Sequence, residues 1–159
     1  MRSYRQHVSI DGLSFGALDD EESDSQALGD GADEDGTLFG SNLQMRPGNT
    51  ATLSLYVSNT TGKTAYLEAW IDWNGDGDLN APGKKILTLH DSTSGFPSSY
   101  TVTVPNDAIL DQDIGVRFRL SHENNKTPLG TVESGEVEDY MIRISCETQV
   151  CLPINITKN

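Results

Sequence analysis

The sequence predicts an all-β fold built as an antiparallel β-sandwich, and three observations support this prediction. Short segments alternate apolar and polar residues with a period of two, as half-buried strands do. Turns rich in Gly, Pro, Asn and Ser separate these segments at short intervals. No segment of about eleven or more residues shows the 3.6-residue period of an amphipathic helix. The pattern does not distinguish a jelly-roll topology from an immunoglobulin-like one.

The first expected strands lie in the N-terminal half of the chain. Residues 8–15 hold enough apolar side chains for one short strand, within an acidic, glycine-rich lead-in that runs to residue 36. Residues 51–58 alternate strictly between apolar and polar side chains. After a turn at residues 59–63, residues 65–73 form the next expected strand.

The C-terminal half continues in the same manner. In its longest alternating segment, the apolar side chains share one face, while Arg117 and Arg119 share the other. The expected strands of this half are residues 85–89, 100–104, 114–120 and 137–144.

The length of 159 residues suits one domain with its own core. We expect this domain to span residues 8–145, preceded by a linker remnant at residues 1–7. Residues 146–159 would be a linker or the start of a following module, so the chain is expected to lie among neighbouring domains of a larger protein. Cys146 and Cys151 would form a disulfide in an oxidising compartment and remain reduced in the cytosol.

The chain is strongly acidic, with a formal net charge of -13 at pH 7. This charge excludes a nucleic-acid partner on electrostatic grounds, because phosphate contacts require clustered Lys and Arg. Metal cations are the partners that such a surface favours. No apolar run reaches the roughly 18 residues that a membrane-spanning helix needs, so we expect no insertion into a membrane.

Residues 72–80 have the spacing of a calcium-binding loop. Oxygen-bearing side chains occupy every second position, and Gly77 stands where such a loop turns sharply. Calcium binds about six to eight oxygens, and the expected ligands here are Asp72, Asn74, Asp76, Asp78 and Asn80. The twelfth position, which should carry a bidentate Glu, is Gly83, and Lys84 follows it. The alternative is a hairpin turn, which Asn-Gly and Asp-Gly dipeptides also favour.

Two further acidic clusters would supply the missing carboxylate. The first comprises Asp30, Asp33, Glu34 and Asp35, and the second comprises Glu136, Glu138 and Asp139. On a strand, Glu136 and Glu138 would share one face and repel each other unless a cation or an arginine lay between them. The loop is therefore expected to be half of a site, or one of two neighbouring sites, completed by one of these clusters. A solvated acidic loop is the alternative interpretation of residues 30–35.

Residues 135–140 read Gly-Glu-Val-Glu-Asp-Tyr, and the chain resembles the GEVED-domain family, which is named after this motif. Further landmarks of the family occur in the same order, so the resemblance covers about residues 12–144. It implies a β-rich module of bacterial secreted and cell-surface proteins, often adhesins, with acidic motifs that resemble calcium ligands. Family members often have Glu where this chain has Lys84, which makes a distant carboxylate more necessary.

We therefore expect a non-catalytic, calcium-stabilised module of a bacterial secreted or cell-surface protein, acting in adhesion and binding one or more Ca2+ ions. Its other partner would be a glycan or a protein of the host or cell surface. The alternative is a calcium-dependent carbohydrate- or peptide-binding module attached to a secreted enzyme, with Tyr56, Trp73 or Tyr100 stacked on a sugar ring. A hydrolase with Glu136 and Glu138 as paired carboxylates is a third hypothesis, but their adjacent same-face positions fit metal ligation better.

Overall fold

The computed structural model describes residues 10–15, 37–38, 45–91, 95–124, 126–130 and 135–144. The described residues form strands and no helix, so the expected all-β character is confirmed for this part of the chain. The strands are β1 (Leu13–Phe15), β2 (Thr37–Leu38), β3 (Thr50–Leu55), β4 (Val57–Asn59), β5 (Tyr66–Ile71), β6 (Lys85–His90), β7 (Ser99–Thr103), β8 (Asp113–Ser121) and β9 (Glu136–Arg143). The acids at residues 30–35 and the segments 1–7 and 146–159, with both cysteines, lie outside the described residues.

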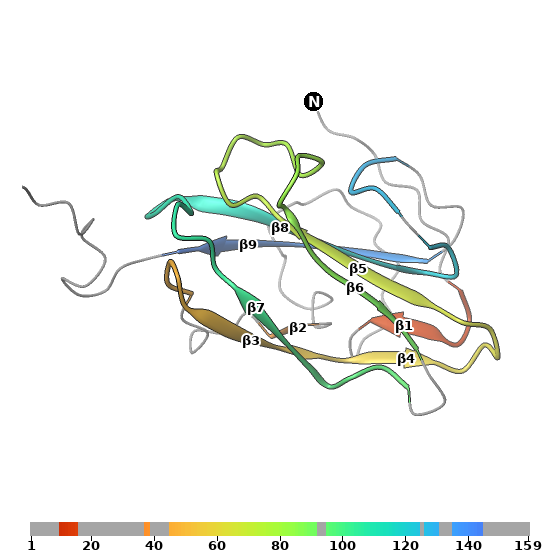
Figure 1. Ribbon diagram of the computed structural model, residues 1–159. Coiled ribbons are helices and arrows are strands. Elements are labelled where there is room, and N and C mark those ends of the chain that lie inside the picture. The colour runs from red at the N-terminus through yellow and green to blue at the C-terminus, as the bar shows by residue number, and fades with distance from the viewer. Residues whose placement is uncertain are drawn as a thin grey trace, which may run out of the picture.

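Every strand pair in the described residues is antiparallel, as predicted. One sheet has the order β6-β5-β8-β9, a second has the order β2-β3-β7, and β1 pairs with β4. In Figure 1 the four-stranded sheet forms one layer, and the remaining strands form the layer that faces it. The two layers enclose the apolar core, which is the arrangement that a sandwich requires.

Each expected strand differs from the observed one by at least one residue, and two of these differences bear on the sheets and on the acidic loop. The expected strand at residues 51–58 is divided at Tyr56, because β3 pairs with β2 and β7 whereas β4 pairs with β1. The expected strand at residues 65–73 ends earlier, since β5 stops at Ile71 and the acidic loop follows at once.

The core takes alternate residues from the central strands β5 and β8. Phe118 of β8 lies at its centre, where its ring centroid is 5.1 Å from that of Phe15 on β1. Because the strands are in register, the apolar positions of one lie opposite those of the other, and the prediction for the two faces of residues 114–120 is confirmed. The core residues contributed by these two strands are Leu67, Ala69, Ile71, Ile114, Val116, Phe118 and Leu120.

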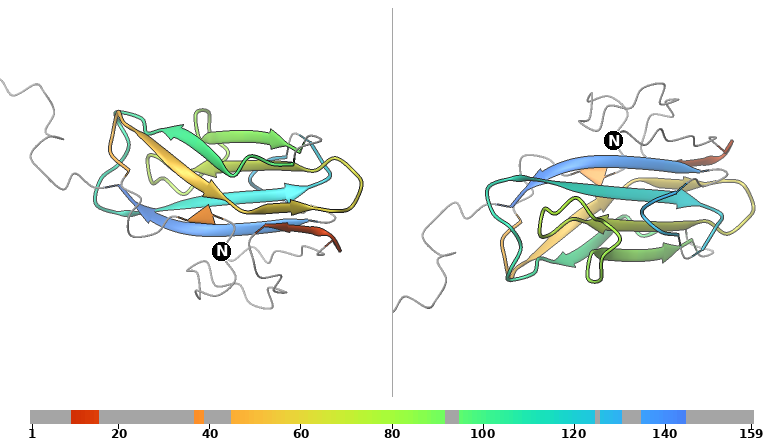
Figure 2. Two further views of the ribbon diagram at one scale, coloured as in Figure 1. Left: turned by 90° about the horizontal axis from the view of Figure 1, so that it is seen from below. Right: turned by 90° about the horizontal axis from the view of Figure 1, so that it is seen from above.

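The outer face of the four-stranded sheet is polar and yet largely covered. Glu68, Trp70 and Arg119 point to this face and are buried. Two loops lie over it at opposite ends of the sheet, as the right-hand view of Figure 2 shows. One is the acidic loop between β5 and β6, and the other comprises residues 122–130, called here the covering loop, of which residue 125 is not described.

Candidate functional site

The acidic loop begins from a position fixed by the sheet. The backbone N–H of Asp72 donates to the carbonyl oxygen of Gly115 in β8, at 2.9 Å. On the other side, the N–H of Ile71 donates to the carbonyl oxygen of Lys84, also at 2.9 Å. The first bond ties the start of the loop to β8. The second holds the start of the loop against its end, so that the pairing of β5 with β6 brings Asp72 and Lys84 together.

Within the loop, alternate side chains fold the backbone rather than point freely outward. The N–H groups of Asp76, Asp78 and Asn80 each donate to the side-chain oxygen of the residue two positions earlier, at 3.4, 2.9 and 2.9 Å. This is the hydrogen bond of an Asx-turn, repeated along the segment. Gly77 has a φ of +82°, and its N–H donates to Oδ2 of Asp72 at 2.9 Å. The sharp turn that the sequence predicts at this glycine is therefore confirmed.

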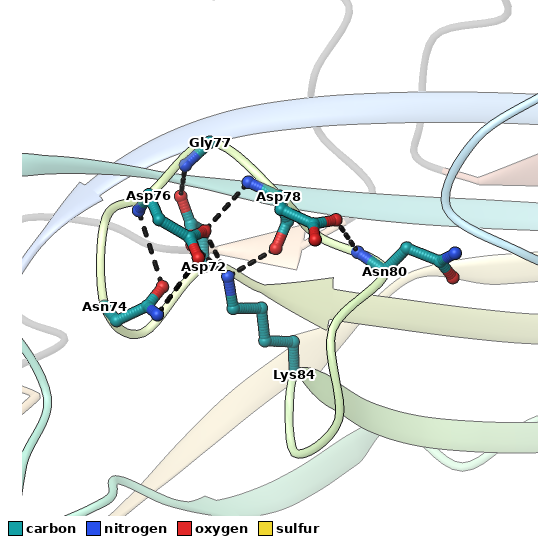
Figure 3. Close-up of polar contacts among 7 residues, drawn as sticks. All are labelled: Asp72, Asn74, Asp76, Gly77, Asp78, Asn80 and Lys84. Carbon is teal, nitrogen blue, oxygen red and sulfur yellow. Dashed lines mark hydrogen bonds and ion pairs between the residues drawn. The ribbon is translucent and has the colours of Figure 1, made fainter.

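The side chain of Lys84 lies at the centre of the loop (Figure 3). Its Nζ donates to Oδ1 of Asp72 at 2.7 Å, to Oδ1 of Asp76 at 2.5 Å, and to the backbone carbonyl oxygen of Asp78. An ammonium group has three N–H donors, so this set of acceptors matches its full donor capacity. Lys84 is 4% exposed and Asp72 is 5% exposed, which makes this ion pair a buried one.

The charges in the loop shift one another's proton affinities. The hydrogen bond from Lys84, followed in importance by the backbone N–H of Asp78, holds the pKa of Asp76 well below its usual range. Burial by itself would lower the pKa of Lys84, but the hydrogen bonds that Lys84 donates to Asp72 and Asp76 outweigh it, and the pKa is raised. Both shifts favour the charged forms, so Asp76 and Lys84 are both ionised across the neutral pH range.

The five residues predicted as loop ligands therefore play different parts. Asp72 and Asp76 direct carboxylate oxygens to the centre, while Asp78 directs its backbone oxygen there. The side chain of Asn74 instead donates to Oδ2 of Asp76 at 3.1 Å, and the N–H of Asn80 caps the carboxylate of Asp78. The three central groups stand at the first, fifth and seventh positions, and the seventh contributes its backbone carbonyl, as in the calcium-loop pattern.

These oxygens suit calcium in kind, but the place where calcium would bind is filled. Calcium–oxygen distances are about 2.3–2.6 Å, and Nζ of Lys84 lies 2.5 and 2.7 Å from the carboxylate oxygens of Asp76 and Asp72. Lys84 Nζ and a calcium ion would therefore compete for the same point. The kind of oxygen suits calcium, whereas the small number of oxygens at this centre and its occupation by Lys84 do not.

The acids of residues 136–139 have partners of their own on β9. Glu136 and Glu138 share one face of β9, as predicted. Their register with Leu120 and Phe118 makes this the core face, which was not predicted. Glu136 accepts a hydrogen bond from the N–H of Phe15, and Glu138 accepts one from the hydroxyl of Tyr140.

Asp139 lies on the opposite face of β9. It accepts two hydrogen bonds from Arg117 on β8, from Nε at 2.8 Å and from Nη2 at 3.0 Å. Such a bidentate pair fixes the orientation of the guanidinium group. Arg117 uses Nη1 for the carbonyl oxygen of Pro128, at 2.5 Å, so the pair also holds the covering loop.

The register separates residues 136–139 from the acidic loop. Glu138 on β9 lies opposite Phe118 on β8, which lies opposite Ala69 on β5. Glu138 is therefore separated from Asp72 by two strand spacings across the sheet and by the three residues from Ala69 to Asp72 along the strand. With about 3.3 Å per residue and 4.8 Å per strand, this amounts to roughly 14 Å between the two backbones. The pairing of β8 with β9 does not bring Glu138 beside the loop centre. The four acids at residues 30–35, the other expected source of a completing ligand, lie outside the described residues.

A buried polar cluster on the outer face was not predicted. Glu68 is 0% exposed and accepts a hydrogen bond from the N–H of Lys126 at 2.8 Å, while the ammonium groups of Lys85 and Lys126 pair with its carboxylate. Burial lowers the pKa of Lys126, and Glu68 offsets only part of this effect. The expected strand at residues 65–73 gave Glu68 no role. The signal that was available is the presence of Trp70 and Arg119 on the same face, because large and charged groups together indicate a covered surface.

Arg119 holds the covering loop in place. Its guanidinium group donates to the carbonyl oxygens of Thr127, Leu129 and Gly130, at 2.5, 2.9 and 2.6 Å. These bonds tie three backbone groups of the covering loop to one side chain of β8, and the carbonyl oxygen of Leu129 also accepts from the hydroxyl of Thr127. The basic residues of β8 therefore act as clamps for a loop, a role that period-two alternation alone does not reveal.

The aromatic residues considered for sugar stacking differ in exposure. Trp73 is 7% exposed and belongs to the core, and Tyr100 is partly buried against it. Tyr56 is 49% exposed and remains accessible in the described structure.

The part of the chain that the structure describes contains no helix long and apolar enough to cross a membrane.

Comparisons with curated proteins and with solved structures gave no match. A comparison with family models gave a match. The matched segment extends from the start of β5, through the acidic loop and the covering loop, to the end of β9. It is narrower than the resemblance noted from the sequence, but it includes both the loop and the Gly-Glu-Val-Glu-Asp motif. Residues 66–143 of this chain match the family model of the GEVED domain.

Proposed function

We propose that this chain is a non-catalytic module of a bacterial secreted or cell-surface protein and that it acts in adhesion. In this proposal, the acidic loop is a brace that closes one end of the β5–β6 pair and requires a cation at its centre. The match of residues 66–143 to the GEVED domain supports the kind of module. The observation that carries the brace is the convergence of Asp72, Asp76 and the backbone of Asp78 on one positive charge.

The described acids support a structural rather than a catalytic use. Glu68 is bound by two lysines, Asp72 by Lys84, and Asp139 by Arg117. A carboxylate that serves as general acid or nucleophile must reach a substrate, whereas these groups are engaged with neighbouring side chains or backbone. The same holds for Glu136 and Glu138, the pair considered for hydrolysis, whose partners are Phe15 and Tyr140.

Calcium enters the proposal in two ways. At the acidic loop it would compete with Lys84 for the same oxygens, and at residues 30–35 it would bind carboxylates that lie outside the described structure. In either place it would stabilise the native chain by RT ln(1 + [Ca2+]/Kd). The carbohydrate-binding alternative depends on exposed Tyr56, because Trp73 is committed to the core.

The brace is tested by removing the central charge. Lys84→Met keeps an apolar stem of similar length but leaves Asp72 and Asp76 facing each other without a cation. We expect a clear drop in the melting temperature measured by circular dichroism. Lys63→Met removes the same charge from an exposed position between β4 and β5 and serves as the matched control. If the two variants melt at the same temperature, the loop needs no cation and the brace proposal fails.

A further inference from the structure

We infer that Lys84 is the resident cation of the acidic loop, so that this chain keeps the loop closed without calcium. This inference rests on the proposed function, namely that the loop requires a cation at its centre. It goes further by assigning that cation to the chain itself and by naming Lys84 as the residue that excludes the metal. The part of the family pattern that implies calcium at this loop would then not apply to this chain.

The first argument is the fit of the ammonium group to its acceptors. Three oxygens surround Nζ, from the two carboxylates of Asp72 and Asp76 and from the backbone of Asp78. An ammonium group forms about three hydrogen bonds, and a calcium ion requires about six to eight oxygens. Among the predicted loop ligands, Asn74 and Asn80 do not direct a described contact to this centre but support the turn. The coordination offered by the described residues thus matches an ammonium group better than calcium.

The second argument is that Lys84 is held in place both at its backbone and at its ammonium group. Its backbone carbonyl oxygen is bonded to the N–H of Ile71, one residue before Asp72. Its side chain is 5% exposed along its path to the loop. A metal ion could occupy this centre only after this side chain had moved out.

The third argument is the balance of charge at the centre. The carboxylates of Asp72 and Asp76 meet one ammonium group, which leaves a formal charge of about minus one, and 45% of the Asp76 side chain is exposed to water. A calcium ion placed beside Lys84 would be repelled by it at short range. The ion and the lysine are therefore alternatives, and the lysine has the advantage of being covalently tethered, since its local concentration does not depend on the medium.

The consequence is that one substitution decides between two modes of closing the loop. With Lys84 present, the loop is closed by hydrogen bonds from within the chain. With a carboxylate at this position, the central lysine is gone and an oxygen ligand takes its place beside Asp72 and Asp76. The variant Lys84→Glu should therefore acquire a calcium site that the natural chain lacks.

The test is a calorimetric calcium titration of the natural chain, Lys84→Glu and Lys84→Ala, with melting curves in EDTA and in about 10 mM calcium, which exceeds the Kd of weak extracellular sites. Lys84→Ala serves if Lys84→Glu does not fold without the metal. Lys63→Glu is the control, because it makes the same charge reversal at an exposed position.

For the natural chain we expect no binding heat at this loop, and no calcium-dependent shift in melting temperature that Asp76→Asn removes. For Lys84→Glu we expect a one-to-one site with a Kd of about 10⁻⁴ to 10⁻³ M and a rise in melting temperature of at least about 3 to 6 °C in calcium. The Asp76→Asn substitution within Lys84→Glu should abolish both effects, which locates the ion at the loop.

Calcium binding by the natural chain that Asp76→Asn removes would overturn the inference and would leave the brace intact, with calcium as its cation. Failure of both Lys84→Glu and Lys84→Ala to respond to calcium would also overturn it, because the lysine would then not be what excludes the metal. The brace itself is judged separately, by the stability of Lys84→Met against Lys63→Met.

Discussion

The interaction between Asp72 and Lys84 can be measured by a double-mutant cycle. The perturbations are Asp72→Asn, Lys84→Met and the two together, and the assay is urea unfolding at pH 7 followed by circular dichroism. The two side chains are 7% and 5% exposed, with their charged atoms 2.7 Å apart. Removal of one partner from a buried ion pair costs about 3–5 kcal/mol, because the other charge is left unpaired.

The structure places the expected values at the lower end of this range or below it. After Lys84→Met, Oδ2 of Asp72 still accepts from the N–H of Gly77, so we expect a loss of about 3 kcal/mol. After Asp72→Asn, Lys84 still donates to Asp76 and to the backbone of Asp78, so we expect about 2 kcal/mol. The double variant leaves no unpaired charge at the Asp72 position and should lose about 3 kcal/mol rather than 5, a coupling of about 2 kcal/mol.

The control cycle combines Lys63→Met with Asp107→Asn. Both residues are exposed, and neither pairs with the other, so their effects should add to within about 0.5 kcal/mol. A coupling below about 0.5 kcal/mol for Asp72 and Lys84 would refute the reasoning, because the pair would then behave like an ordinary surface ion pair. In melting temperature, the single Lys84→Met substitution corresponds to a fall of roughly 10 °C.

Three further predictions concern the acidic loop, the four-stranded sheet and the covering loop. Since the pKa of Asp76 is lowered in the folded chain, the stability that this group contributes is present above about pH 4 and is lost as the pH falls through its lowered value. The melting-temperature gap between the natural chain and Lys84→Met should therefore shrink on acidification, and a gap that widens would contradict the assignment. Gly135→Ala places a Cβ 2.1 Å from a carbonyl oxygen of β8 at a φ of +139°, so it should cost about 2 kcal/mol or more, whereas Gly115→Ala, which meets nothing within 4 Å, should be milder in the same urea assay. Arg119→Met releases three carbonyl oxygens of the covering loop, so hydrogen exchange should rise in that loop by about tenfold or more, while exchange unchanged there would show that the loop holds itself.

The sequence by itself determined the features that depend on near neighbours in the chain. Period-two alternation assigned Val116 and Phe118 to the core and Arg117 to the other face, because successive side chains of a strand point to opposite sides. The sharp turn of the acidic loop at Gly77 was also predicted, and this glycine adopts a positive φ. The Asx-turns were not predicted, although each joins residues only two positions apart.

The tertiary structure decided which distant groups meet. Lys84 was interpreted as a missing ligand, and it lies instead at the loop centre, because the pairing of β5 with β6 carries its side chain back over Asp72. The strand pairings likewise place Glu138 far from that centre, although both segments carry the same kind of ligand. Glu68 follows the polar phase of its strand and yet is fully buried, because the covering loop folds over it.

The physical reason for this division is the range of the forces involved. Alternation and Asx-turns are set by covalent geometry and by hydrogen bonds between residues close in sequence, so they leave a periodic record in the chain. The partner of a charged side chain is chosen by register, by burial and by which loop covers a face, and none of these is periodic. A lysine and a calcium ion satisfy the same carboxylates, and only the arrangement in space shows that in this chain the lysine reaches them.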